Sequence, residues 1–258
     1  MPLDEASLRA SVQAALQNAA SGTPVCPPNP DWSLACWNSA QTTTVVLVGV
    51  YAVVIFALWR TFILAPLKLI VVALHEWGHA TATWMTCGSV EGMEVHSDEG
   101  GVTKSRGGNR FIILSAGYLG SALWGMAMVV SSGDKIGVQI MAGFLGISLL
   151  MTLFLAKNFI LVALTIGFEL LLAGFWACTL LTSFNGLEYF VLFVGVMSGL
   201  FSIYDIYDDL LSRRVNESDA SMLAKHTHTS SRCWGAIWAV ISLAMMGCGV
   251  YLCLVVQS

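Results

Sequence analysis

The chain carries the apolar segment LKLIVVALHEWGHATATW at residues 67–84, and the motif His75-Glu76-Trp77-Gly78-His79 lies near its centre. The motif reads H-E-x-x-H. On a helix the two histidines lie one turn apart on the same face, where two imidazoles can hold one zinc ion. Glu76 can then act as general base on a water molecule activated by the metal. The segment is long enough to cross a bilayer, where ionisable side chains are expensive, so the motif indicates a functional site.

Composition places the whole chain in a membrane. Its 258 residues are 56% hydrophobic and 11% charged, whereas soluble domains are about 45–50% apolar and about 25% charged. The formal net charge is −4, and the pair Arg213-Arg214 is the only basic cluster in the sequence. We therefore expect the lipid bilayer as a partner and no binding to nucleic acid.

A helix needs about 20 residues to cross the apolar core of a bilayer. Candidate segments are Thr43–Trp59, Phe62–Trp84, Phe111–Ser131, Ile136–Ala156, Phe159–Thr182, Leu187–Tyr204 and Trp234–Val256. Pro66 lies early in the second segment and marks either a kink or the true start of its helix. The sequence thus predicts an all-α polytopic membrane protein with about seven transmembrane helices.

Two polar regions accompany these segments. Residues 1–40 form a polar N-terminal tail, which we separate from a membrane-embedded domain at residues 41–258. The loop Cys87–Arg110 is polar and Gly-rich, and Val90–Val95 and Gly101–Lys104 are predicted to be short strands. We therefore expect a small β-hairpin-like loop directly after the motif helix. Its glycines could admit an extended substrate by strand addition, or they could serve turns.

Basic residues predict an orientation, provided that all seven segments cross the membrane. The N-terminal tail and the loops after the second, fourth and sixth segments then share one side, with nine Lys and Arg residues against three on the other. The positive-inside rule places that side, and the N-terminus with it, in the cytosol. Cys26 and Cys36 in the tail could pair only in an oxidising compartment.

A catalytic zinc site needs a third protein ligand and an open position for water. The best donors lie in Tyr204-Asp205-Ile206-Tyr207-Asp208-Asp209, because the sixth segment and the motif segment end on the same side. Asp205 is preferred because it is closest to the apolar span. Asp208 would share its helical face and is the alternative ligand or a partner of a histidine. The same aspartates could also form a solvated helix end.

Glu169 is an acidic residue within the apolar segment Phe159–Thr182. It has no charged neighbour in the sequence. It either belongs to a polar pathway through the membrane or reaches an interface because the span is offset.

Four further motifs follow H-E-x-x-H along the chain. They are Gly100-Gly101-Val102-Thr103, Ser115-Ala116-Gly117-Tyr118-Leu119-Gly120-Ser121, the Asp205 motif and Ser218-Asp219-Ala220. With H-E-x-x-H, this set resembles the site-2 protease group of intramembrane zinc metallopeptidases, in particular its compact peptidase-like branch. The resemblance covers roughly residues 67–238 and implies a metallopeptidase-like membrane domain. It also implies His75, His79 and Asp205 as zinc ligands and Glu76 as the base.

The sequence departs from that group at two places. Asp205 is followed by Ile206, without the Pro or Gly that surrounds the third ligand in better-known members. Their Gly-Pro-x-x-Asn in the intervening helix corresponds here to Gly117-Tyr118-Leu119-Gly120-Ser121. If that asparagine positions the substrate, Gly117 and Ser121 must do so here, or the activity differs.

Three functions follow as hypotheses. The first is an intramembrane zinc metalloprotease that cleaves a transmembrane or membrane-associated protein. The second is a zinc-binding membrane scaffold or quality-control factor of the same fold that does not cut. The third is a transporter with an ion path through His75, Glu76, Glu169 and Asp205, which is disfavoured because the chain shows no obvious inverted repeat of broken helices.

Overall fold

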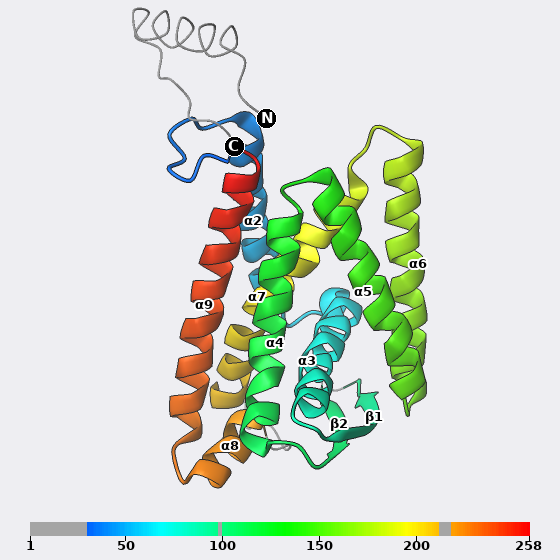
Figure 1. The fold of residues 1–258 in the computed structure, drawn as a ribbon, viewed down its shortest axis with the longest axis vertical. Helices are drawn as coiled ribbons and strands as arrows, with labels where there is room; N and C mark the ends of the chain where they lie inside the picture. Colours follow the sequence, from blue (N-terminus) through cyan, green and yellow to red (C-terminus); the bar gives the residue numbers. More distant parts are fainter. Residues whose placement is uncertain (1–29, 98–99, 212–217) are drawn as a thin grey trace, which may run out of the picture.

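The computed structural model describes residues 30–97, 100–211 and 218–258, with the backbone alone for residues 206–211. Helices long and apolar enough to cross a membrane dominate the described chain. They are α2 (Ser39–Leu58), α3 (Ala65–Met85), α4 (Arg110–Ser131), α5 (Lys135–Leu155), α6 (Phe159–Leu181), α7 (Gly186–Leu211) and α9 (Ser231–Val256). With seven such helices and one small sheet, the predicted fold class is confirmed (Figure 1).

Short elements complete the fold. A 3-10 turn, η1 (Phe62–Leu64), links α2 to α3, and a short helix, α8 (Asp219–Thr227), precedes α9. Strands β1 (Ser89–Val95) and β2 (Gly101–Arg106) pair in antiparallel fashion directly after α3. The small hairpin expected after the motif helix is therefore present.

Polar residues fix where the helices begin. The side chains of Asn109 and Asp134 accept hydrogen bonds from the first backbone N–H groups of α4 and α5, and Asn158 does so for α6. The amide of Asn158 also donates to the carbonyl of Val95, which ties β1 to the start of α6. Pro66 lies in the first turn of α3, where its missing N–H costs nothing, so it marks the start of that helix.

Helix α4 lies at the centre of the bundle and packs against α3, α7 and α9 (Figure 1). Glycines permit the closest contacts. A Cβ on Gly78 of α3 would overlap the carbonyl oxygen of Ala116, and a Cβ on Gly125 would overlap the backbone nitrogen of Gly199 in α7. Helices α3 and α7 are thus held against α4 at backbone distance.

Helices α2 and α3 run in the same direction. The start of α2 contacts the end of α9, because Gln41 donates a hydrogen bond of 2.8 Å to the carbonyl of Leu254. Helix α9 is parallel to α4, since Phe111 and Trp234 are neighbours near their starts. The end of α3 contacts the start of α4, where the N–H of Asn109 donates to Thr86 Oγ1. Both α2 and α3 are therefore antiparallel to α4.

This direction changes the topology that the sequence analysis assumed. Helices α2 and α3 follow one another in the same direction and do not form a hairpin. The start of α2 therefore lies with the C-terminus, at the end opposite to the loops that follow α3, α5 and α7 (Figure 1). The premise that the N-terminal side of α2 shares a side with those loops is not met. Hydropathy locates spans but does not record their direction.

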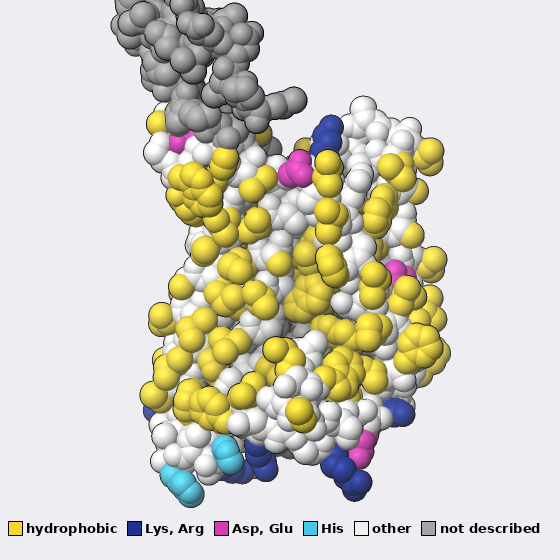
Figure 2. All heavy atoms as spheres, viewed as in Figure 1, with side chains coloured by type: hydrophobic (Ala, Val, Ile, Leu, Met, Phe, Trp, Pro, Cys, Tyr) yellow, Lys and Arg dark blue, Asp and Glu magenta, His cyan; other side chains and the backbone are white. Residues whose placement is uncertain are grey.

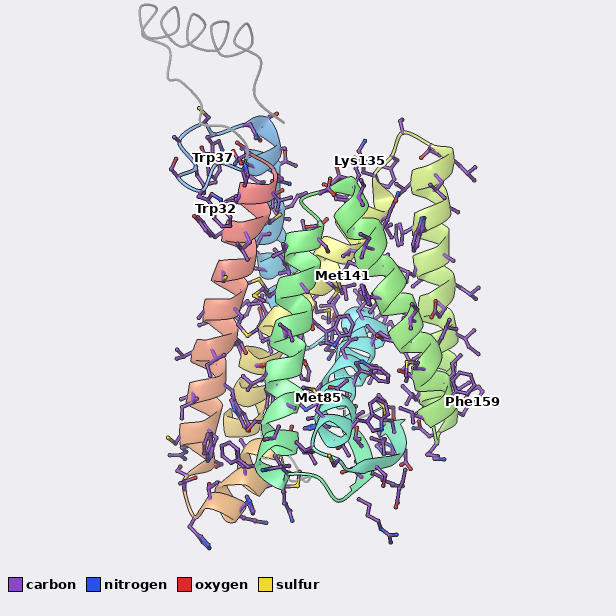
Figure 3. The ribbon with its side chains drawn as sticks, viewed as in Figure 1. Trp32, Trp37, Met85, Lys135, Met141 and Phe159 are labelled. Carbon is purple, nitrogen blue, oxygen red and sulfur yellow. The ribbon has the colours of Figure 1, made fainter. Side chains whose placement is uncertain are left out.

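The two ends of the bundle differ in character. We call the end with the β-hairpin, α8 and the start of α4 the site end, and the end with the start of α2 and the C-terminus the opposite end. Trp32, Trp37 and Lys135 lie at the opposite end (Figure 3). Between the two ends, Figure 2 shows a belt of mainly hydrophobic side chains, with most of the basic side chains at the site end.

The shared location of the start of α2 and the C-terminus can be tested with a thiol reagent that does not cross membranes. In sealed, oriented vesicles carrying single-cysteine variants, Ser39→Cys and Ser258→Cys should be labelled from the same side. Native Cys87, which is exposed at the site end, should be labelled from the other side. Labelling of Ser39→Cys together with Cys87 would contradict this arrangement.

Candidate metal centre

Three side chains converge between α3 and the start of α8. Nε2 of His75 and Oδ2 of Asp219 are 2.8 Å apart, and Nε2 of His79 lies 3.1 Å from each of these two atoms. The two histidines are buried, and the Asp219 side chain is only 9% exposed. Within the described chain, this is the only group of at least three His, Cys, Asp or Glu residues arranged to hold a metal ion.

The spacing of the three atoms fits a metal ion. Ligand atoms at about 2.0–2.1 Å from a tetrahedral zinc ion are about 3.3 Å from one another. The observed triangle is a few tenths of an ångström tighter, so a small outward movement would admit the ion. Two imidazoles and one carboxylate also form a usual donor set for a catalytic zinc, with a fourth position left for water.

Local structure orients the histidines toward this point. Nδ1 of His79 lies 2.7 Å from the carbonyl oxygen of Ile113 and must donate to it, so Nε2 is the nitrogen that would offer its lone pair to a bound metal ion. Nδ1 of His75 is buried without a hydrogen-bond partner among the described residues. On the facing helix, a Cβ at Gly117 would overlap His75 Nε2 and approach the His79 ring. The glycine thus keeps the space in front of the ligand atoms clear.

Asp219 reaches the histidines because it begins α8. Ser218 caps that helix, with its hydroxyl accepting from the N–H of Ser221, and places Asp219 in the first turn. Burial alone raises the pKa of the Asp219 carboxyl, but the neighbouring His79 and hydrogen bonds with both imidazoles outweigh it. The pKa of Asp219 therefore lies well below its usual range, and the carboxylate is ionised.

Glu76 lies beside the three ligands and is held by β2. Its carboxylate oxygen Oε2 accepts a hydrogen bond of 2.6 Å from the Thr103 hydroxyl, which also lies 3.0 Å from the Glu76 backbone carbonyl. A Cβ at Gly101 would overlap the carboxylate. The β-hairpin therefore fixes the position of Glu76 through one hydroxyl and one glycine.

The structure does not place Asp205 in the group of three. Asp205 is buried in α7 and accepts a hydrogen bond of 2.5 Å from the hydroxyl of Tyr118. The Tyr118 ring packs edge-on against the ring of His75, with centroids 4.8 Å apart. The expected third ligand thus lies behind His75, connected to it through Tyr118, while Asp219 completes the group of three. The side chain of Asp208, the alternative ligand, is outside the described residues.

Gly117 and Ser121 have different surroundings. Gly117 faces the ligand nitrogens, as described above. Ser121 is fully buried one turn further along α4, where its carbonyl accepts a hydrogen bond of 2.9 Å from Ser198 of α7. Its hydroxyl has no partner among the described residues. Ser121 therefore belongs to the contact between α4 and α7.

Sequence reasoning did not choose Asp219 as a ligand, although Ser218-Asp219-Ala220 was among the motifs of the resemblance. Asp219 lies outside every apolar segment, and the depth argument favoured an aspartate at the end of a span. The usable signal was the helix-capping pattern of Ser218 before a short amphipathic helix, which could have placed Asp219 at a helix start.

The fold and this site define a polytopic membrane protein with a candidate metal centre inside its helical bundle. A family model described as Peptidase M50B-like matches residues 48–249. The chain therefore belongs to the Peptidase M50B-like family. No curated protein and no solved structure matches the chain.

The two aspartates can be distinguished by metal content. We expect Asp219→Asn to weaken zinc binding at least about tenfold, because a neutral amide replaces an ionised ligand, whereas Asp205→Asn should keep zinc near the wild-type level. The measurement is zinc per protein in purified samples equilibrated over a series of buffered zinc concentrations. His75→Ala serves as the positive control for loss. Zinc loss in Asp205→Asn with retention in Asp219→Asn would restore Asp205 as the ligand.

Proposed function

We propose that the protein is an intramembrane zinc metallopeptidase that hydrolyses peptide bonds of membrane proteins. The convergence of His75, His79 and Asp219 beside Glu76 is the observation that carries this proposal. The family assignment supports a peptidase, and the donor set supports zinc. Asp219 replaces Asp205 as the third ligand in this proposal.

Each group then has a defined task. Zinc bound here would lower the pKa of a water molecule and polarise the scissile carbonyl. Glu76 takes the proton from the attacking water and later gives it to the leaving amine. The Thr103 hydroxyl holds Oε2 of Glu76, which leaves Oε1 for the proton. The carbonyl of Ile113 keeps His79 in the tautomer that a metal ligand requires.

Strand β2 provides a surface on which an unwound substrate could be held. The far edge of β1 is already occupied, because Lys157 donates its N–H to the carbonyl of Met93. Among the described residues, β2 has no backbone partner other than β1 and the hairpin itself. A transmembrane helix must unwind before its carbonyls can be reached. An extended segment added to β2 would lie beside Glu76, which Thr103 and Gly101 of the same strand contact.

Two observations support a cytosolic location for the site end. The described basic residues there are Lys104, Arg106, Arg110, Lys157, Lys225 and Arg232, whereas Lys135 lies at the opposite end. Cys36, near the start of α2 at the opposite end, is disulfide-bonded. Disulfides form and persist in oxidising compartments and are rare in the cytosol. We therefore place the start of α2 outside the cytosol, in contrast to the sequence-based prediction, and expect cleavage near the cytosolic end of the substrate helix.

A scaffold that binds membrane proteins without cutting them is the second candidate. The replacement of an expected substrate-positioning asparagine by Ser121, which is fully buried beside α7, favours it. A scaffold and a peptidase would share the same metal site. They differ only in turnover.

Substitution of Glu76 separates these two candidates. In a peptidase, Glu76→Gln should lower cleavage at least about 10³-fold, because the amide cannot accept the proton, while zinc content stays unchanged. The measurement uses proteoliposomes and reporter proteins whose transmembrane helix contains Gly and Pro near its cytosolic end. Cleavage by Glu76→Gln at the wild-type rate would contradict the assigned base. Zinc binding with no turnover by the wild type would favour the scaffold.

The role of Thr103 gives a second, finer test. Thr103→Val keeps the shape of the side chain but removes the hydroxyl, so we expect kcat to fall about tenfold with little change in KM or zinc content. Thr103→Ser keeps the hydroxyl and should restore most of the rate. An equal loss in both variants would mean that packing of the strand matters and the hydrogen bond to Glu76 does not.

A further inference from the structure

Glu169 is an acidic residue in the middle of a membrane-spanning helix. Helix α6 runs from Phe159 to Leu181, so Glu169 lies close to its midpoint. It faces Gly146, which is at the midpoint of α5: a Cβ on that glycine would lie 3.6 Å from Glu169 Oε2. The carboxyl group is therefore at the depth where a bilayer is most apolar.

One oxygen of this carboxyl group, Oε1, is buried and has no hydrogen-bond partner among the described residues. An acidic group at the centre of a bilayer without a partner is costly, and such residues usually mark a function. The proposed catalytic groups do not include it, and α6 carries none of the three candidate ligands.

The surface around Glu169 faces lipid. The side chains of Ile166 and Leu170 in α6 and of Ile147 and Leu150 in α5 are exposed. Figure 2 shows a mainly hydrophobic surface in this part of the molecule. Gly143 and Gly146 face α6, since a Cβ on Gly143 would approach only Trp176, at 3.9 Å. Glu169 itself is only partly buried, so a second helix could reach its carboxyl group from the surface.

The chemistry of Glu169 limits what can cover it. Lipid head groups do not reach the centre of the bilayer. A second copy of the chain offers no cation at that depth: of the Lys and Arg residues within the seven candidate spans, Arg110, Lys135 and Arg232 lie in the first turns of their helices. Lys68 is buried against Trp59. The remaining source of a cation is the transmembrane helix of another protein.

We propose that the α5–α6 face around Glu169 binds a transmembrane helix of a partner protein with Lys or Arg at the middle of its span. The carboxylate would pair with the basic group, and both groups would be removed from lipid. This interaction does not depend on the proposed peptidase activity, because it uses a different face of the bundle.

The test measures binding of synthetic transmembrane peptides to the full-length protein in liposomes, by energy transfer between attached dyes. One peptide is a Leu/Ala-rich helix with a central Lys; the matched peptides have Leu at the centre or Lys one turn from an end. Wild type should bind the central-Lys peptide about tenfold more tightly than the other two. Glu169→Gln should lose this preference, whereas Glu188→Gln, which changes a carboxyl in α7, should keep it.

The charge-exchanged pair provides an independent measurement. Glu169→Lys should bind a peptide with a central Glu and lose the central-Lys peptide. Equal binding of all peptides by wild type, or an unchanged preference in Glu169→Gln, would overturn the proposal. Energy transfer between two labelled copies of the protein that disappears in Glu169→Gln would also overturn it, because the occupant would then be a second copy.

Discussion

The close contact between α3 and α4 is the constraint on which the site depends. Gly78 lies inside the H-E-x-x-H motif, and its missing side chain lets the backbone of α3 touch Ala116 of α4. One residue later, Gly117 leaves the space in front of the histidine nitrogens. Larger residues at either glycine would separate the helices or fill the metal position. The packing of two membrane helices and the formation of the ligand set are thus one geometric requirement, as expected where small residues drive helix contact in lipid.

The spans and the first two ligands could be predicted from sequence because both are local properties. Apolar runs of about 20 residues identify membrane helices, and histidines four residues apart must share a face. The direction of α2 could not be predicted in this way. It depends on hydrogen bonds such as that from Asn38 to the carbonyl of Gln257, between residues more than 200 positions apart. No pattern within a single segment records such a pairing.

The third candidate ligand also could not be predicted from a local sequence pattern. Asp205 and Asp219 are both aspartates after the same apolar segment, and composition cannot distinguish them. Their roles differ because Tyr118 of α4 takes Asp205 as its hydrogen-bond acceptor, whereas the packing of α8 against α4 and α9 brings Asp219 to the histidines. A tertiary contact, and not a motif spacing, decides which carboxylate lies with the two histidines. The depth argument, and the family resemblance with it, assigned that role to the aspartate nearest to the span.

The origin of the three candidate ligands also fits the proposed hydrolysis inside a membrane protein. Two ligands come from α3, which is buried in the bundle, and the third comes from α8, which is too short and too polar to span a bilayer. The group therefore lies where the apolar bundle ends and the polar site end begins. A peptide could approach from the lipid side while water enters from the polar side. A site made only from residues deep in the spans would lack the water, and one made only from loop residues would not meet a membrane-embedded chain.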